Sequence, residues 1–184
     1  MAEYYLISQL PSLDGISEST PIPITGERFL ELCDRFLVRK TRSEIRKLTL
    51  APPLIPERSG SSLIEAWNDG ERNLRLALGK ARADKMKKPF DVGSTSLSAE
   101  LMRVASAAVE MESPMEAEKF LSDYRLGFLE TLRPMDTFSE DFVFYYGLKL
   151  KLLLRIRQFD VKLGEAVYRN IYNSILNGDS MEVM

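Results

Sequence analysis

The segment 139–159 constrains the fold more than any other part of the chain. Its body reads FVFYYGLKLKLLLRIRQF, with apolar side chains around most of a helical circumference. A helix of this kind is usually buried among neighbours on more than one side. Thr137 and Ser139 are alternative N-cap residues for it. The uncharged apolar run 142–148 is much shorter than the roughly 20 residues that a membrane span requires. We therefore expect the central helix of a globular protein.

Capping residues and chain breakers divide the rest of the chain into further helices. Apolar periodicity predicts helices that start after Thr25, near Thr41 or Ser43, near Ser62, after Ser96 or Ser98, and at Ser113-Pro114. A last helix is expected over roughly 161–176, ending at Asn177-Gly178. For residues 3–13, a short buried strand and a tucked extended segment fit equally well. The prediction is an all-α, bundle-like domain of six or seven helices with one short extended N-terminal segment.

Two loops rich in proline, serine and glycine are candidate hinges. They cover residues 51–61 and 89–96. A length of 184 residues suits one domain or two small lobes. We expect a single helical domain over 1–184, and the alternative is two lobes hinged near either loop.

The chain contains no histidine and only one cysteine, Cys33. Ser-His-Asp and Cys-His catalysis are therefore excluded, and so are zinc and iron sites that use histidine. Cys33 falls on the apolar face of its expected helix and is interpreted as a buried structural residue, because reactive thiolates lie in electropositive, partly exposed surroundings. No glycine-rich phosphate loop occurs. We predict no catalytic residue, no cofactor and no metal site.

Charge and cysteine content limit the class of partner and the compartment. A net charge of −2 argues against general binding of nucleic acid, which is normally the property of a basic domain. A single cysteine cannot form an internal disulfide, which fits a reducing cytoplasm. No basic stretch followed by an apolar core opens the chain, so no signal peptide is apparent.

The most distinctive local pattern is a basic helix that contains WNDGERNLR. Glu71 and Arg75 are four residues apart in the favourable orientation for an ion pair within a helix. Further cations follow toward residue 88. We name four candidate partner-binding residues: Arg72, Arg75, Arg82 and Lys85. They predict a docking surface for an acidic partner, and the alternative is a solvated helix whose C-terminal cations complement its dipole.

Two other groups leave an enzyme-like interpretation open. One is an acidic cluster near Tyr124, with Glu110, Glu112, Glu116, Glu118, Asp123 and Glu130. These positions fall at helix starts and on polar faces, so a solvated acidic face is the simpler interpretation. The other group is Lys149 with Tyr145 and Tyr146. Basic residues that interrupt an apolar helix can bury their stems and expose their heads.

Four segments in order carry a resemblance to a known family. They are EYYLISQLPSL at the start of the chain, FLELC, W-x-x-x-ERNLR followed by Arg82-Ala83, and YGLKLKLLLR. Together they resemble the bacterial domain of unknown function 2764 family, whose members are typically encoded among V-type ATPase subunit genes. The resemblance covers the chain to about Gly164. It implies an all-α counterpart of the ATPase subunit that caps the central rotor stalk, and no established site residues come with it.

The expected function is therefore a non-catalytic subunit or accessory factor of a V-type rotary ATPase. Its partners would be subunits of the central stalk or the membrane ring. It would be cytoplasmic, peripheral to the inner membrane through the complex, and would neither bind nucleic acid nor span the membrane. The alternative is a helical adaptor, or a small-molecule binder or enzyme that uses carboxylate, lysine and tyrosine side chains alone.

Overall fold

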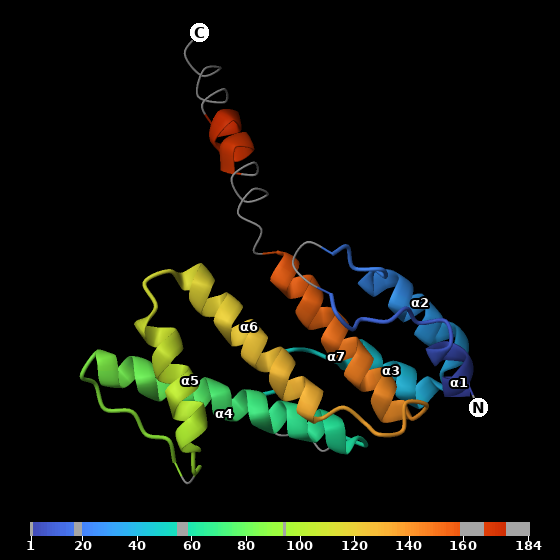
Figure 1. Ribbon diagram of the computed structural model, residues 1–184, viewed down its shortest axis with the longest axis horizontal. Helices are drawn as coiled ribbons and strands as arrows, with labels where there is room; N and C mark the ends of the chain where they lie inside the picture. Colours follow the sequence, from blue (N-terminus) through green and yellow to red (C-terminus); the bar gives the residue numbers. More distant parts are fainter. Residues whose placement is uncertain (1, 17–19, 55–58, 94, 159–167, 176–184) are drawn as a thin grey trace.

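The computed structural model describes residues 2–16, 20–54, 59–93, 95–158 and 168–175, and within these ranges the chain is all-α with no strand (Figure 1). The helices are α1 (Ala2–Ile7), α2 (Gly26–Phe36), α3 (Arg39–Lys47), α4 (Ser62–Lys85), α5 (Ala99–Glu110), α6 (Pro114–Thr131) and α7 (Glu140–Arg157). Residues 168–175 are also helical, with every side chain exposed. The predicted fold class is confirmed. The rest of the predicted last helix, with its Asn177-Gly178 cap, lies outside the described residues.

Five helices begin at serine or threonine N-caps, most of them at predicted positions. In each case the cap hydroxyl accepts a hydrogen bond from the backbone N–H three residues later, at 3.1 to 3.3 Å. The caps are Thr25, Ser61, Ser98, Ser113 and Ser139. The structure thereby selects Ser98 over Ser96 and Ser139 over Thr137. Since a cap contacts only its own first turn, it is readable from local sequence.

The start of α3 departs from the predicted cap at Thr41 or Ser43. The helix begins at Arg39, and Val38 occupies the cap position without a side-chain hydrogen bond. Thr41 is buried inside the helix, where its hydroxyl donates to a Glu140 carboxylate oxygen at 2.8 Å. This residue therefore joins α3 to the first turn of α7 instead of capping α3.

The prediction of a strand or extended segment at the N-terminus is wrong for residues 2–7, which form α1. Leu6 on this helix is completely buried, and α1 lies against α2 and α7. A short apolar run fits a strand and a buried helical turn equally well, so its packing partners decide the outcome. Residues 11–13 have no regular structure, and Leu13 is buried.

Helix α7 is the central element, as predicted, and contacts α1, α2, α3, α4 and α6 (Figure 1). Every residue from 143 to 150 is buried. A Cβ at Gly147 would lie 3.2 Å from both Phe29 and Leu48, so the absence of a side chain there permits close approach.

Apolar periodicity in the sequence predicts that Phe36, Trp67, Tyr146, Leu150 and Leu153 are largely buried. Four of these five side chains are buried in the structure, namely Trp67, Tyr146, Leu150 and Leu153. Phe36, the fifth, is only partly buried and packs against the edge of the core. The helix-period pattern therefore located the core face correctly, except at this edge of α2.

Two clusters of buried apolar residues share α4 and α6. The larger surrounds α7 and includes Trp67 and Leu129, whereas the smaller is built by α5 with Leu74 and Leu121. The boundary between the clusters therefore crosses α4 between residues 67 and 74.

The hinges near 51–61 and 89–96 stay predictions. None of the helices in the described ranges has the length and hydropathy of a membrane-crossing helix.

Candidate functional site

The four basic residues named on α4 divide into two pairs. Arg72 is partly buried and donates to Asp69 at 2.7 Å and to the carbonyl oxygen of Pro53 at 3.5 Å. The Arg75 Nε donates to Glu71 Oε1 at 3.1 Å, which confirms the predicted pair within the helix. Both guanidinium groups therefore have partners inside the molecule. A partner-binding role for the four residues stays a prediction.

Arg82 and Lys85, at the C-terminal end of α4, are placed differently. Both are exposed. The Lys85 Nζ donates to the carbonyl oxygen of Val109 at 2.6 Å, so its charge has no carboxylate partner in this contact. The Arg82 guanidinium forms no ion pair with any residue in the described ranges. Neither cation therefore has a carboxylate partner in the described part of the chain.

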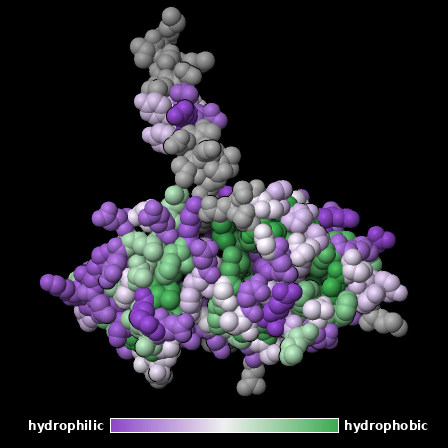
Figure 2. All heavy atoms as spheres, in the orientation of Figure 1, coloured by the Kyte–Doolittle hydropathy of each residue, from purple (hydrophilic) through white to green (hydrophobic). Residues whose placement is uncertain are grey.

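Arg82 and Lys85 border an open groove of about 520 Å³ between α4, α5 and α6, which we call the α4–α5–α6 groove. Its buried floor consists of Leu78, Ala108 and Leu121. The other apolar lining residues are Met86, Val109, Met111, Pro114 and Ala117. Figure 2 shows hydrophobic residues at the surface where α5 meets the start of α6, surrounded by hydrophilic ones. The sequence predicted Arg82 and Lys85 as partner-binding residues, but it did not predict the apolar surface beside them.

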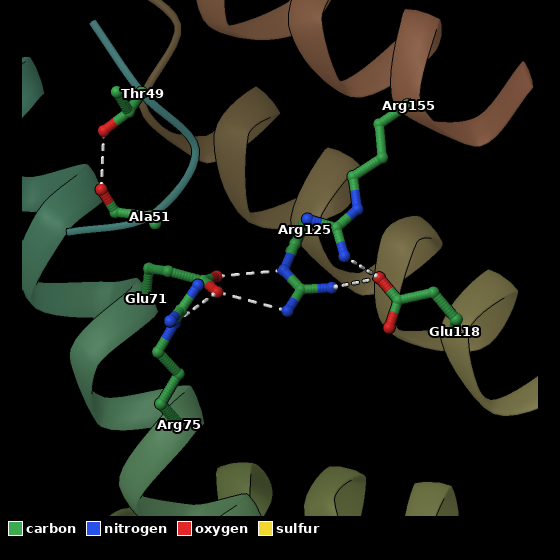
Figure 3. Close-up of polar contacts among 7 residues, drawn as sticks. All are labelled: Thr49, Ala51, Glu71, Arg75, Glu118, Arg125 and Arg155. Carbon is green, nitrogen blue, oxygen red and sulfur yellow. Dashed lines mark hydrogen bonds and ion pairs between the residues drawn. The ribbon is translucent and has the colours of Figure 1, made fainter. Parts of the chain in front are cut away.

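A chain of alternating charges links α4, α6 and α7 (Figure 3), and one of its members, Glu118, also lines this groove. Arg125 on α6 bonds both oxygens of the buried Glu71 carboxylate, at 2.9 and 3.1 Å. The other side of Arg125 lies 3.5 Å from Glu118, which also accepts a 2.7 Å hydrogen bond from Arg155 on α7. We call the set Arg75, Glu71, Arg125, Glu118 and Arg155 the charge ladder. Figure 3 also shows Thr49, which donates to the carbonyl oxygen of Ala51 at 2.6 Å.

The charge ladder also sets the electrostatics of the groove. Glu118 is the only carboxylate among the described residues that line it, and two arginines neutralise this carboxylate. The net charge presented by the lining is therefore positive. Sequence reasoning found the Glu71–Arg75 pair but missed Arg125, which is 54 positions away from Glu71 in the chain.

Lys149, the centre of the enzyme-like alternative, belongs to a cluster of polar side chains in the structure. The Lys149 ammonium lies 2.6 Å from Asp14, 2.7 Å from Glu130 and 3.3 Å from the Tyr145 hydroxyl. Tyr145 donates to Glu130 at 2.7 Å, and a cavity of about 190 Å³ lies beside the group. The lysine is buried with its charged head, unlike the predicted arrangement in which the stem is buried and the head exposed.

The pKa shifts in this cluster favour structural roles. Burial by itself lowers the pKa of Lys149, but the hydrogen bonds to Asp14 and Glu130 outweigh it and raise that pKa above its usual range. Burial raises the pKa of Glu130, yet its bonds to Lys149 and Tyr145 bring the pKa below its usual value. Burial and the bond to Glu130 raise the pKa of Tyr145 to about 12. Acid-base catalysis needs a pKa near the working pH, and none of these groups has one.

The remaining candidates behave as structural or solvated groups. Cys33 is 1% exposed, and burial raises its pKa to about 12, which agrees with the structural interpretation. Five of the six predicted acidic residues are exposed, and Glu118 belongs to the charge ladder. Burial, with Glu100 and Glu71 nearby, raises the pKa of Tyr124. No group of three or more metal-ligating side chains is found in the ranges that the structure describes.

No protein-family model, curated protein or solved structure matches this chain. The resemblance to the domain of unknown function 2764 family stays a prediction from the sequence.

Proposed function

We propose that this chain is a non-catalytic subunit or accessory factor of a V-type rotary ATPase, docking at the central stalk or the membrane ring. The observation that carries a docking role concerns the C-terminal end of α4. There, Arg82 has no carboxylate partner among the described residues and stands beside an open apolar groove. Unpaired surface charge adds little to folding stability, but it speeds encounter and fixes register in association.

The choice of assembly is supported by the sequence resemblance, whose four segments fall on α1, α2, α4 and α7 and their flanks. The proposal places the chain in the cytoplasm, held at the inner membrane through the complex.

Co-purification tests both parts of the proposal. The tagged chain is isolated from its own host at low salt, where screening of charge is weakest, and the proteins that accompany it are identified by mass. We expect V-type ATPase subunits with the parent chain. Arg82→Glu should reduce their recovery about tenfold, whereas Arg103→Glu, on an exposed position of α5 outside the groove, should not.

Each negative result has its own meaning. If the parent brings down no ATPase subunit, the assignment to this assembly is overturned. If Arg82→Glu retains the subunits as well as the parent does, the end of α4 is a solvated helix and docking uses another surface.

The Lys149 cluster supports a second candidate, a small-molecule binder, because a cavity lies beside Tyr145 and Lys149. The ammonium is already saturated by Asp14 and Glu130, so a bound anion would compete with two internal carboxylates. The observations therefore favour docking over this alternative.

A further inference from the structure

We propose that the α4–α5–α6 groove binds an amphipathic helix of a partner protein, with apolar side chains in the groove and a carboxylate of that helix on Arg82. The proposal rests on the docking role proposed above and specifies the chemistry of the partner.

The apolar part of the argument comes from the lining. Leu78, Ala108 and Leu121 form a buried floor, while Met86 on the rim is 59% exposed. An exposed methionine beside a concave apolar surface is typical of grooves that receive helices, because its flexible side chain adapts to the shape of the guest. The volume of about 520 Å³ can hold a few apolar anchors of one helix face.

The charge of the groove selects an acidic guest. Arg82 and Lys85 are the cations on its border, and the Glu118 carboxylate is held by Arg155 at 2.7 Å and lies 3.5 Å from Arg125. A guest carboxylate beside Arg82 would meet an arginine with no competing internal partner in the described part of the chain. A guest lysine at the same place would face uncompensated repulsion. Charge complementarity therefore chooses the sign of the guest.

The shape of the groove favours a protein segment over a small amphiphile. Arg82, Lys85, Met86 and Pro114 are all exposed along its border, so one side is open to water. Sites for small molecules usually enclose most of the surface of their ligand. A helix leaves its polar face in solvent and needs only the open side that this groove provides.

The test uses the full chain labelled with ¹³C at the methionine methyl groups and a synthetic amphipathic peptide as the probe. The peptide carries leucines at helical spacing and glutamates beside them, and its two matched versions replace glutamate with glutamine or lysine. We expect the acidic peptide to shift the Met86 and Met111 signals, which report on the groove, and to leave that of Met135 unchanged, since Met135 is fully exposed and outside the lining. The acidic peptide should bind about tenfold more tightly than the glutamine version at low salt.

Two variants with matched controls separate the charge from the apolar surface. Arg82→Gln should abolish the preference for the acidic peptide, whereas Arg103→Gln should keep it. Met86→Glu should prevent binding of the acidic peptide, whereas Met135→Glu should not. All four positions are exposed, so the variants should fold, and circular dichroism checks this.

Several outcomes would overturn the proposal. They are no shift at millimolar peptide, equal binding of the three peptides, and tighter binding of dodecanoate, which would assign the groove to a small amphiphile. Groove signals that change with protein concentration alone would assign it to a second copy of the chain. The peptide experiment contains no ATPase, so its failure leaves the assembly assignment standing, and a failed co-purification leaves the groove chemistry standing.

Discussion

Arg125 on α6 donates hydrogen bonds to both carboxylate oxygens of Glu71 on α4, from Nε at 2.9 Å and from Nη2 at 3.1 Å. The two side chains are 10% and 3% exposed, so the pair is almost entirely shielded from water. It lies where the two apolar clusters meet, with Trp67 on one side along α4 and Leu74 on the other. A buried pair of this kind orients α6 on α4, because breaking it leaves an uncompensated charge in the interior.

Arg125→Met should therefore lower the free energy of unfolding by about 3–5 kcal/mol, because Glu71 would keep only the half-exposed Arg75 as a partner. The double variant Glu71→Leu/Arg125→Met should lose much less, since no buried charge is left unpaired. Arg28→Met, which removes an exposed pair with Glu31, is the control and should change stability by less than about 1 kcal/mol. Urea denaturation measures all three. Equal losses in the single and double variants would contradict the buried-charge argument.

Reversing the charge of Arg75 and of Arg82 should have unequal effects on stability. Arg75→Glu places a second carboxylate beside the buried Glu71, so the melting temperature should fall by several degrees. Arg82→Glu removes a cation with no internal carboxylate partner in the described ranges and should leave the melting temperature within a few degrees of the parent. Differential scanning calorimetry of the two variants makes the comparison. A large drop for Arg82→Glu would show that this arginine serves the fold.

Gly70 on α4 marks a close approach to α6. A Cβ at this position would lie 2.3 Å from the ring of Phe128, which itself stacks on Trp67 at 6.2 Å between centroids. Gly70→Ala should therefore destabilise the protein by about 1–3 kcal/mol, despite the better helix propensity of alanine. Gly127→Ala on α6 is the matched control, because a Cβ there meets nothing within 4 Å. It should stabilise by about 0.5–1 kcal/mol. Chemical denaturation that ranks the two in the opposite order would show that Phe128 moves aside freely.

Lys149 should govern the response of stability to acid. The hydrogen bond to Lys149 lowers the pKa of Asp14, and bonds to Lys149 and Tyr145 overcome burial to lower that of Glu130. Because both carboxyl groups have a lower pKa in the folded chain than in the unfolded chain, the unfolded chain binds more protons in acid. Their contribution to stability is present above the unfolded pKa values and is lost as the pH falls through the folded ones.

Lys149→Met should consequently flatten the decline of stability below about pH 5, besides lowering stability at neutral pH. Lys151→Met, two positions along the same helix and partly exposed, should keep the slope of the parent. Unfolding free energies measured from pH 3 to pH 7 give the slopes directly. An unchanged slope in Lys149→Met would mean that this cluster does not set the acid response.

The thiol of Cys33 should be unreactive in the native protein. Burial raises its pKa to about 12, so the thiolate fraction is very small at pH 8, and the side chain is 1% exposed. Ellman's reagent should react only at the rate at which the protein opens, and at once after denaturation. Rapid labelling of the native protein would contradict both the burial and the structural role.

Helix starts were the part of the fold most readable from the sequence. Ser113 with Pro114 and the serines before α4, α5 and α7 all lie within three residues of the N–H groups that they cap. Such contacts depend only on neighbours along the chain, so they form independently of how the helices pack. The central place of α7 was readable for a related reason, since its apolar circumference needs neighbours on several sides.

The N-terminal segment and the candidate site were beyond that kind of reasoning. Whether residues 2–7 form a strand or a helix depended on α2 and α7, which cover Leu6. Helical spacing placed Arg72, Arg75 and Arg82 on one element and predicted the Glu71–Arg75 pair. It could not say that Arg72 reaches the carbonyl oxygen of Pro53, or that Arg82 has no ion pair with the described residues.

The sequence by itself determined an all-α chain with most of its helix starts, a central α7 and a chemical inventory without histidine. Only the tertiary structure decided which charges pair between distant parts of the chain. Glu71 meets Arg125 across 54 positions, and Lys149 meets Asp14 across 135. The physical reason is the distance along the chain over which each kind of contact forms. Caps and periodicity arise from contacts a few residues apart, whereas the fate of a buried charge depends on whichever side chain a distant helix brings beside it.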